Sequence, residues 1–303
     1  MIASSLPHDP RILVIGAGGR LGSVLADYFG KRYRVTALGR SQLNLSDPGS
    51  IAAVLDGMDF THVFLTAAMT AVDRCETHEK EAFAVNGTAP GIIAEISAAK
   101  GAHVTHIGTD MVFDGMKGAP YSETDSPNPI SVYGASKLEG ERRVLAASPA
   151  NLVARVSWLF GPGRPAFPDW IIQQARGRED VTLPADKSGN PTYTMDLADW
   201  LDALVFRTPA APAAGIYHLC NSGHCAWRDW GQLCIETALG CGVPLLARDI
   251  RGVPLDSVAA FVARRPRDSS LSTGKFTRTT GILPRPWQEA VREFVMQISM
   301  QSS

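Results

Sequence analysis

Short apolar runs alternate with longer segments of helical period along the first half of this chain. The runs have the length of buried strands, and the longer segments repeat their apolar positions about every three to four residues. This alternation predicts an α/β fold, a Rossmann-type doubly wound parallel sheet that binds ligands at the carboxyl ends of its strands. The expected strands are residues 11–15, 34–38, 62–66, 103–107 and 152–156, and the expected helices are 21–31, 73–99 and 131–147.

The later part of the chain is richer in proline and glycine. Loops are expected at residues 161–168 and 184–191, and a proline-bearing stretch covers 244–266. An amphipathic pattern at residues 287–298 predicts a closing helix. We interpret these segments as a smaller, discontinuous lobe.

Composition narrows the choice of partners. The 303 residues are 45% hydrophobic and carry a formal net charge of −1, so no global field favours nucleic acid or anionic lipid. The segment from Met1 to Pro10 has neither the cationic start nor the apolar run of a signal peptide. We therefore expect a cytoplasmic protein.

The 5 cysteines form no CxxC pair and accompany no histidine cluster of zinc-site spacing. We expect them to be structural thiols and predict no metal site. Free cysteines are commonly buried as small apolar residues.

A glycine-rich turn follows the first expected strand. Gly16, Gly19 and Gly22 match the pattern GxxGxxG, with Arg20 and Leu21 between the last two. Residues without a Cβ let the backbone approach a pyrophosphate, which the first turn of the following helix then binds. The pattern predicts a dinucleotide site, and its alternative is an ordinary tight turn.

The end of the second expected strand indicates which dinucleotide is bound. An acid usually stands here when the adenosine ribose keeps its free 2′-hydroxyl, but this chain has Arg40 and Ser41. A guanidinium and a hydroxyl fit a 2′-phosphate, so NADP(H) is preferred over NAD(H). A solvated surface arginine is the alternative interpretation.

Tyr133 and Lys137 lie one helical turn apart in a YxxxK pattern. A neighbouring ammonium is expected to lower the pKa of the tyrosine, which can then donate a proton to a carbonyl oxygen that hydride transfer reduces. Thr109 follows the fourth expected strand, where its hydroxyl could bond the same oxygen. Together with the glycine turn, these residues define a short-chain dehydrogenase/reductase pattern, although an exposed helical pair is the alternative for YxxxK. Asp110 is interpreted as an acceptor for backbone donors in the turn.

The sequence resembles the dTDP-4-dehydrorhamnose reductase family along nearly its whole length. That resemblance adds motifs to the glycine turn and the YxxxK pattern, and it implies an extended short-chain reductase. The matching pieces are TAAMTAVDRCE at residues 66–76, AVNGTAP with Asn86, GTDMVFDG at 108–115, PYSETDSPNPISVYGASKLEGE at 120–141, RVSWLFG at 155–161, GNPTYTMDLAD at 189–199 and GIYHLCNSG at 215–223.

The resemblance also implies roles for individual residues. Thr109, Tyr133 and Lys137 would be catalytic, and Lys137 would also hold the nicotinamide ribose hydroxyls. The cofactor's path would be lined by Ala67 and Ala68. The sugar nucleotide would face Thr70, Met69, Met111, Trp158, Pro191 and Thr192. Packing of the lobe is the alternative role for Trp158, while Trp170 and Trp200 are expected in the core.

Some positions depart from the family pattern. The family usually has serine at Gly108, tyrosine at Met111 and often tyrosine at Met69, and it often has aspartate at Asn44. The methionines lie beside the expected sugar pocket, so they leave the chemistry intact and put the exact substrate in doubt.

These observations set the expected domains and activity. Residues 1–156 would form the NAD(P)-binding Rossmann domain, with 192–222 returning to it. Residues 157–191 and 223–303 would form mainly the substrate-binding lobe and the closing helix. The expected reaction is NADPH-dependent reduction of a 4-keto-6-deoxy sugar nucleotide in dTDP-rhamnose synthesis.

The alternatives are another keto-sugar-nucleotide reductase or epimerase of the extended group, and a non-catalytic regulatory subunit resembling the methionine adenosyltransferase β subunit. The expected partner is the small sugar nucleotide, without nucleic acid or membrane. A homodimer is the oligomeric state considered.

Overall fold

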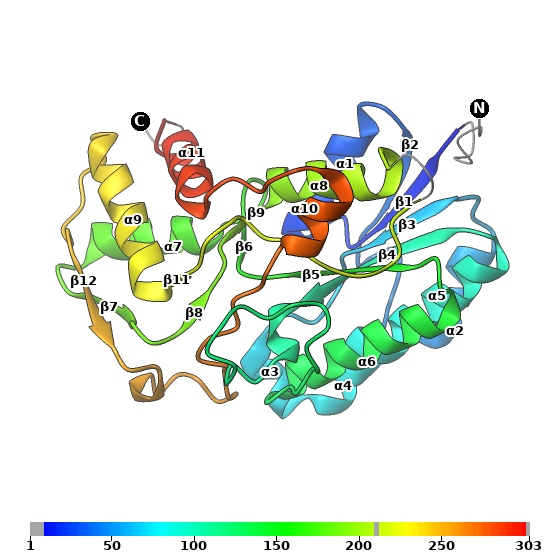
Figure 1. The fold of residues 1–303 in the computed structure, drawn as a ribbon, viewed down its shortest axis with the longest axis horizontal. Helices are drawn as coiled ribbons and strands as arrows, with labels where there is room; N and C mark the ends of the chain where they lie inside the picture. Colours follow the sequence, from blue (N-terminus) through cyan, green and yellow to red (C-terminus); the bar gives the residue numbers. More distant parts are fainter. Residues whose placement is uncertain (1–8, 209–211, 301–303) are drawn as a thin grey trace.

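A parallel sheet and the helices that cover it form the larger part of the molecule (Figure 1). The computed structural model describes residues 9–208 and 212–300, so most of the segment from Met1 to Pro10 lies outside the described residues. The sheet is 6-stranded, with order β10-β5-β4-β3-β1-β2. Every pair in it is parallel. Its strands are β1 (Arg11–Ile15), β2 (Arg34–Leu38), β3 (His62–Leu65), β4 (His103–Thr109), β5 (Leu152–Val156) and β10 (Gly215–His218).

The bounds of β1, β2 and β5 match the sequence prediction, and the predicted Rossmann-type doubly wound fold is confirmed. Along β1, Ile12 and Val14 pack into one cluster while Leu13 and Ile15 pack into another. This alternation buries both faces of the strand, as a parallel sheet covered by helices requires.

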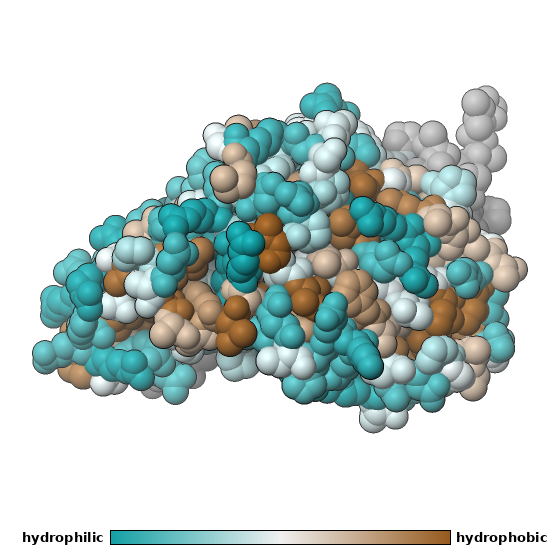
Figure 2. All heavy atoms as spheres, turned by 90° about the horizontal axis from the view of Figure 1, so that it is seen from below, coloured by the Kyte–Doolittle hydropathy of each residue, from teal (hydrophilic) through white to brown (hydrophobic). Residues whose placement is uncertain are grey.

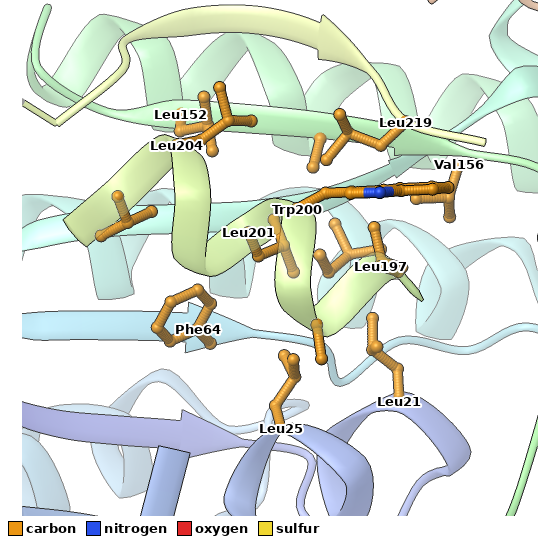
Figure 3. Packing of buried hydrophobic residues seen from close by; sticks show 14 of the residues in the cluster. Leu21, Leu25, Phe64, Leu152, Val156, Leu197, Trp200, Leu201, Leu204 and Leu219 are labelled. Carbon is orange, nitrogen blue, oxygen red and sulfur yellow. The ribbon is translucent and has the colours of Figure 1, made fainter. Parts of the chain in front are cut away.

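Helices cover both faces of the sheet. One face packs against α1 (Arg20–Gly30) and α8 (Thr194–Phe206). Figure 3 shows Leu21 and Leu25 of α1 beneath Leu197 and Trp200 of α8. The other face packs against α2 (Pro48–Asp56), α5 (Ala89–Ala99) and α6 (Val132–Ala147). Asp47 caps α2 and Pro48 begins it.

The single helix predicted over residues 73–99 is wrong. The structure has α3 (Val72–Thr77), α4 (Glu79–Phe83), a π-helical segment η1 (Ala84–Thr88) and then α5. His78 separates α3 from α4 with a non-helical backbone. Within η1, the amide of Asn86 bonds both backbone polar groups of Met69, so the irregular turn places a side chain under the end of β3.

The lobe lies at the side of the molecule away from the N-terminus (Figure 1). Its core packs α7 (Phe167–Gly177), α9 (Trp227–Gly240) and α11 (Trp287–Met300) around β7 (Val181–Pro184) and β12 (Ile250–Val253). The remaining short elements are β6 (Leu159–Phe160), β8 (Ser188–Gly189), β9 (Thr192–Tyr193), β11 (Cys225–Ala226), η2 (Asp110–Val112), η3 (Leu255–Ser257) and α10 (Gly274–Thr280). The segment predicted to return, residues 192–222, contributes β10 to the sheet and α8 to the helices that cover one face of it.

Two surface residues were predicted wrongly. Trp170 is 45% exposed on α7, although Trp200 is buried as expected. Cys241 is exposed, whereas the other cysteines are buried thiols.

The face drawn in Figure 2 carries several separate apolar patches between polar ones.

Among the described residues, no helix has the length and apolarity needed to cross a membrane. Within residues 9–208 and 212–300, no group of three or more His, Cys, Asp or Glu side chains is arranged to hold a metal ion.

A buried ion pair joins β5 to α6. The Arg155 guanidinium donates to Glu141 at 2.7 Å and 3.0 Å, and both side chains are almost fully buried. A Cβ on Gly108 would overlap Glu141, so the glycine at this position makes room for the carboxylate.

We predict that Arg155→Met lowers the free energy of unfolding by about 3–5 kcal/mol, because it leaves the Glu141 carboxylate buried without a counter-charge. Urea unfolding measures this loss, with Arg142→Met on the exposed part of α6 as the control. The double variant Glu141→Met/Arg155→Met should recover much of the loss. A loss below about 1 kcal/mol in the single variant would contradict the assignment.

Candidate active site

The turn after β1 is packed so closely that only glycine fits its key positions. Gly16 has a φ of 99°, and a Cβ there would lie 2.6 Å from the backbone nitrogen of Ala67. A Cβ on Gly22 would overlap the carbonyl oxygen of Gly16, and one on Gly19 would lie 3.2 Å from it. Because β1 pairs with both β2 and β3, this crevice is the topological switch point of the sheet.

The cradle fits a dinucleotide pyrophosphate, since α1 begins directly after Gly19 and presents its first N–H groups there. Leu21 is buried in the core and can offer a phosphate only its backbone. The Arg20 guanidinium donates to the carbonyls of Leu159 at 3.2 Å and Pro165 at 2.5 Å. Burial lowers the pKa of Arg20. Its side chain therefore ties the turn to the loop that follows β6.

Sequence reasoning missed a second cation at this turn. The Arg164 guanidinium lies 3.9 Å from the position of a Cβ on Gly18. Arg164 is exposed in the same loop that Arg20 holds. The proline and glycine around it indicated only a loop.

Arg40 and Ser41 are exposed just beyond β2. The Leu38 carbonyl at the end of β2 accepts hydrogen bonds from the backbone N–H groups of Gly16 and Ala17, at 2.9 Å and 3.0 Å. The strand end and the glycine turn are therefore joined, and Arg40 stands two positions further along. This placement fits a phosphate on the adenosine ribose.

The segment after β3 lies against the glycine turn and then against Tyr133. Ala67 and Ala68 are half-buried there, and Ala67 contacts Gly16. Met69 is buried against Cys75, and Tyr133 packs on the same cluster. The side chain of Thr70 is exposed.

Strand β4 ends at Thr109, and the side chains of Thr109 and Asp110 are both buried. The Thr109 hydroxyl donates to Asp110 at 3.2 Å and accepts from the Met111 backbone N–H at 3.2 Å. Asp110 also accepts from the hydroxyls of Ser157 at 3.0 Å and Ser269 at 2.5 Å. Asp110 is thus a structural acceptor as predicted, but its donors are side-chain hydroxyls and not backbone groups.

Local bonds fix the start of the helix that carries Tyr133. Ser131 caps α6 by accepting from Gly134 N–H at 3.1 Å, and Glu76 accepts from Val132 N–H at 2.9 Å. Tyr133 then lies in the first turn, partly buried.

The pKa of Tyr133 is shifted opposite to the prediction. Burial raises the pKa, while a hydrogen bond with Thr109 lowers it less. The Lys137 ammonium was expected to lower it, but Lys137 donates to the Ile107 carbonyl at 2.6 Å and lies 3.2 Å from His106 Nε2. The raised pKa keeps Tyr133 protonated at neutral pH, the state that a proton donor needs.

Burial also affects Lys137 itself. It lowers the pKa of Lys137 to about 8, although the carboxylate of Glu141 opposes the shift. His106, which sequence reasoning missed, has its pKa lowered by burial and by the Lys137 charge. A neutral imidazole can accept from the ammonium. Two groups of β4, His106 Nε2 and the Ile107 carbonyl, therefore hold Lys137.

Trp158 begins the lobe side of the site. It has a φ of 43°, a left-handed conformation unusual for a bulky residue, and it turns the chain from β5 into β6. Its ring stacks on Trp230 with centroids 5.5 Å apart. A Cβ on Gly189 would lie 2.7 Å from the ring. Trp158 thus packs on the lobe core and remains partly exposed.

Pro191 and Thr192 do not offer side chains to a ligand in this structure. Both are buried, and the Thr192 hydroxyl donates to the Asn190 carbonyl at 3.2 Å. That Thr192 faces the sugar stays a prediction. Met111 is half-buried beside Thr109.

Sequence reasoning also missed Lys187 and Ser269. Lys187 Nζ donates to Ser269 Oγ at 2.9 Å, and Ser269 bonds Asp110. A lysine within the polar stretch DKSGN indicates a solvated loop, so no sequence signal identified it.

The family profile described as "RmlD substrate binding domain" matches residues 10–300. The dTDP-4-dehydrorhamnose reductase of Streptomyces griseus is 38% identical over 289 residues, covering 94% of this chain and 92% of that protein. A probable dTDP-4,6-dihydroxy-2-methyloxan-3-one 4-ketoreductase of Streptomyces antibioticus is 37% identical, covering 93% and 94%.

Solved structures agree with this assignment. The crystal structure of dTDP-4-dehydrorhamnose reductase from Bacillus anthracis in complex with NADP aligns with a TM-score of 0.87 at 28% identity. The alignment covers 95% of this chain and 99% of that one. The dTDP-4-dehydrorhamnose reductase ortholog from Clostridium acetobutylicum gives 0.88 at 29% identity, covering 96% and 100%.

We predict that Gly22→Ala lowers the free energy of unfolding by about 1–3 kcal/mol and weakens NADPH binding, because the new Cβ displaces the Gly16 carbonyl. Gly30→Ala is the matched control, since that glycine ends the same helix with nothing within 4 Å of its Cβ position. Urea unfolding and NADPH fluorescence titration measure both effects. Equal unfolding free energies and equal NADPH affinities of the two variants would show that the turn accommodates a Cβ at position 22.

Proposed function

This chain belongs to the family described as the RmlD substrate binding domain, and from that premise we propose that it is an NADPH-dependent dTDP-4-dehydrorhamnose reductase. The observation that carries the proposal is the contact between Thr109 and Tyr133 at the edge of the sheet that also holds the glycine cradle. A proton donor and a nicotinamide dinucleotide would meet there. The enzyme is an oxidoreductase that forms an alcohol at the keto carbon.

The chain offers a fitting site for NADPH. The cradle of Gly16, Gly19 and Gly22 excludes side chains where a pyrophosphate backbone contact is needed. Arg40 would meet the 2′-phosphate, and Ala67 and Ala68 would line the path toward Tyr133. When bound, the cofactor supplies the hydride.

Tyr133 acts as the general acid. Its raised pKa keeps the phenol protonated, so the proton is present when charge develops on the keto oxygen. Thr109 orients that oxygen through its hydroxyl. Its own position is fixed by the backbone N–H of Met111.

Lys137 supplies positive charge below its pKa of about 8. To hold the nicotinamide ribose hydroxyls, as the family resemblance implies, Nζ exchanges its bond to the Ile107 carbonyl for bonds to the ribose. Activity that needs this charge is present below about pH 8 and falls as the pH rises through that value.

The identity of the sugar depends on Met69 and Met111, because these two residues differ from the family pattern. A thioether is a weak acceptor and cannot replace a tyrosine hydroxyl toward a sugar hydroxyl. NADPH oxidation with a panel of keto-sugar nucleotides tests the assignment. The highest kcat/KM with dTDP-4-dehydrorhamnose supports it, and a higher value with another keto sugar assigns the chain to that substrate.

A cytoplasmic location and a homodimer remain parts of the proposal. The unpaired thiols support a reducing compartment, since secreted domains commonly pair their cysteines. Cell fractionation and sedimentation test the location and the dimer.

We predict that Tyr133→Phe lowers kcat by about 10² to 10⁴-fold, because only the proton donor is removed. NADPH affinity should stay near that of the parent protein, and fluorescence titration measures it. Tyr217→Phe, whose hydroxyl contacts Thr279 at 3.3 Å, is the control and should keep full turnover. Parental kcat in Tyr133→Phe would refute the acid role.

We predict that the parent binds NADPH more tightly than NADH and that Arg40→Asp reverses this order. The carboxylate repels the 2′-phosphate and accepts hydrogen bonds from a free ribose hydroxyl. Paired titrations at fixed ionic strength measure it, because salt screens the charge effect. Arg178→Asp, an exposed position after α7, controls for the change in net charge. Equal affinities of the parent for both cofactors would exclude this role for Arg40.

A further inference from the structure

A buried lysine from the lobe is joined to the catalytic threonine through two side chains. Lys187 Nζ donates to Ser269 Oγ at 2.9 Å, and Ser269 Oγ bonds Asp110 Oδ2 at 2.5 Å. Asp110 Oδ1 in turn bonds Thr109 Oγ1 at 3.2 Å. All of these side chains are at most 5% exposed.

The chemistry of the donors fixes the direction of these hydrogen bonds. An ammonium has only donors, so Ser269 accepts from Lys187 and its own hydrogen must go to Asp110. An ionised carboxylate has only acceptors, so the Thr109 hydroxyl, which also accepts from Met111 N–H, donates its hydrogen to Asp110. Each hydroxyl is thus polarised by a donor behind it and directed at one carboxylate.

We propose that Lys187 is a positioning residue for the reduction, acting through Ser269 and Asp110 to set how strongly Asp110 retains the hydrogen of the Thr109 hydroxyl. The inference rests on the proposed function. The Lys187 charge withdraws electron density from Asp110. Thr109 can then turn its hydrogen toward the keto oxygen. Without that charge, the buried carboxylate would retain the Thr109 hydrogen.

The geometry makes Lys187 the cation that compensates Asp110. Its ammonium also donates to the Ser188 carbonyl at 3.2 Å and lies 5.6 Å from the centroid of the Trp158 ring. The backbone around it is anchored, because Ser188 bridges to Asp268 and the Trp227 N–H donates to the Lys187 carbonyl at 3.1 Å.

The charged groups around Lys187 set the pH range in which its side chain is charged. Burial lowers the pKa of Lys187 to about 8, Asp110 and Asp268 raise it, and Arg265 lowers it. Arg265 is itself paired with Asp73 at 2.6 Å. The Asp110 charge also raises the pKa of two other titratable groups, Tyr133 and Cys220. Lys187 is therefore charged below about pH 8 and loses its charge above that value.

The test compares kcat across the neutral and alkaline range for the parent, Lys187→Arg, Lys187→Gln and Ser269→Ala. Lys137 also titrates near pH 8, but its contribution cancels in the ratio of Lys187→Arg to parent kcat. That ratio should rise as the pH passes about 8, because arginine keeps its charge. Lys187→Gln and Ser269→Ala should lower kcat about tenfold or more at neutral pH, with little change in KM for NADPH.

Lys275→Gln is the matched control. Lys275 is a partly buried lysine on α10 that donates to the Ile216 carbonyl at 2.6 Å, and its replacement should leave kcat and its pH dependence unchanged. Urea unfolding of each variant gives the folded fraction, so that kcat is expressed per folded molecule. Parental kcat per folded molecule in both Lys187→Gln and Ser269→Ala overturns the proposal and leaves Lys187 a purely structural role. A ratio of Lys187→Arg kcat to parent kcat that does not change with pH also overturns the proposal.

A second readout does not depend on turnover. The NMR titration of Lys187 Nζ, identified by its loss in Lys187→Gln, should give a pKa of about 8 in the parent and a lower pKa in Asp110→Asn, because Asp110 raises it. If the parent fails to reduce any keto sugar while the Lys187 pKa falls in Asp110→Asn, the proposed function fails and the link from Lys187 to Asp110 stands. An unchanged Lys187 pKa in Asp110→Asn overturns the link itself.

Discussion

Parallel pairing of neighbouring strands is the constraint from which the site follows. In a parallel sheet the carboxyl ends of all strands lie at one edge, so the residues after each strand meet without help from any loop. Here β1 ends at the glycine turn, β3 at Ala67, β4 at Thr109 and β5 at Ser157. The pairing of Thr109 with Val156 fixes the depth at which the threonine and Ser157 stand. The lobe then has to cover only this edge.

Covering that edge has a cost in stability. The pKa values of Lys137 and Lys187 are each lowered by burial from 10.5 to about 8. The folded state therefore binds these protons less tightly than the unfolded state does. Both ammonium groups reduce stability fully below about pH 8, and the cost declines as the pH rises toward the unfolded value. Buried charges retained at such a cost cluster at functional sites, which agrees with their position beside Thr109 and Tyr133.

Sequence pattern predicts what local physics determines. Apolar runs predicted β1, β2 and β5, the glycine pattern predicted the tight turn before α1, and the segment around the YxxxK pattern predicted the helix of Tyr133. Within the single helix predicted for residues 73–99, the π-helical segment η1 escaped prediction; its Asn86 bonds Met69, which lies 17 residues earlier in the chain. Lys187 escaped prediction as well, since only the folded lobe buries it. The pKa of Tyr133 was predicted with the wrong sign because spacing along a helix does not reveal where an ammonium points.

Substrate choice and catalytic geometry are separable in this fold. Thr109 is held by the backbone N–H of Met111, and the segment after β3 is held through the backbone of Met69 by Asn86. Any residue type except proline supplies these backbone groups. The side chains at both positions can therefore change while the hydroxyls of Thr109 and Tyr133 stay in place. A tyrosine there would add a hydrogen-bonding group, whereas methionine offers an adaptable apolar one. Loss of the only partner of a buried sugar hydroxyl costs about 1–3 kcal/mol, which is enough to change the preferred substrate without altering the reaction.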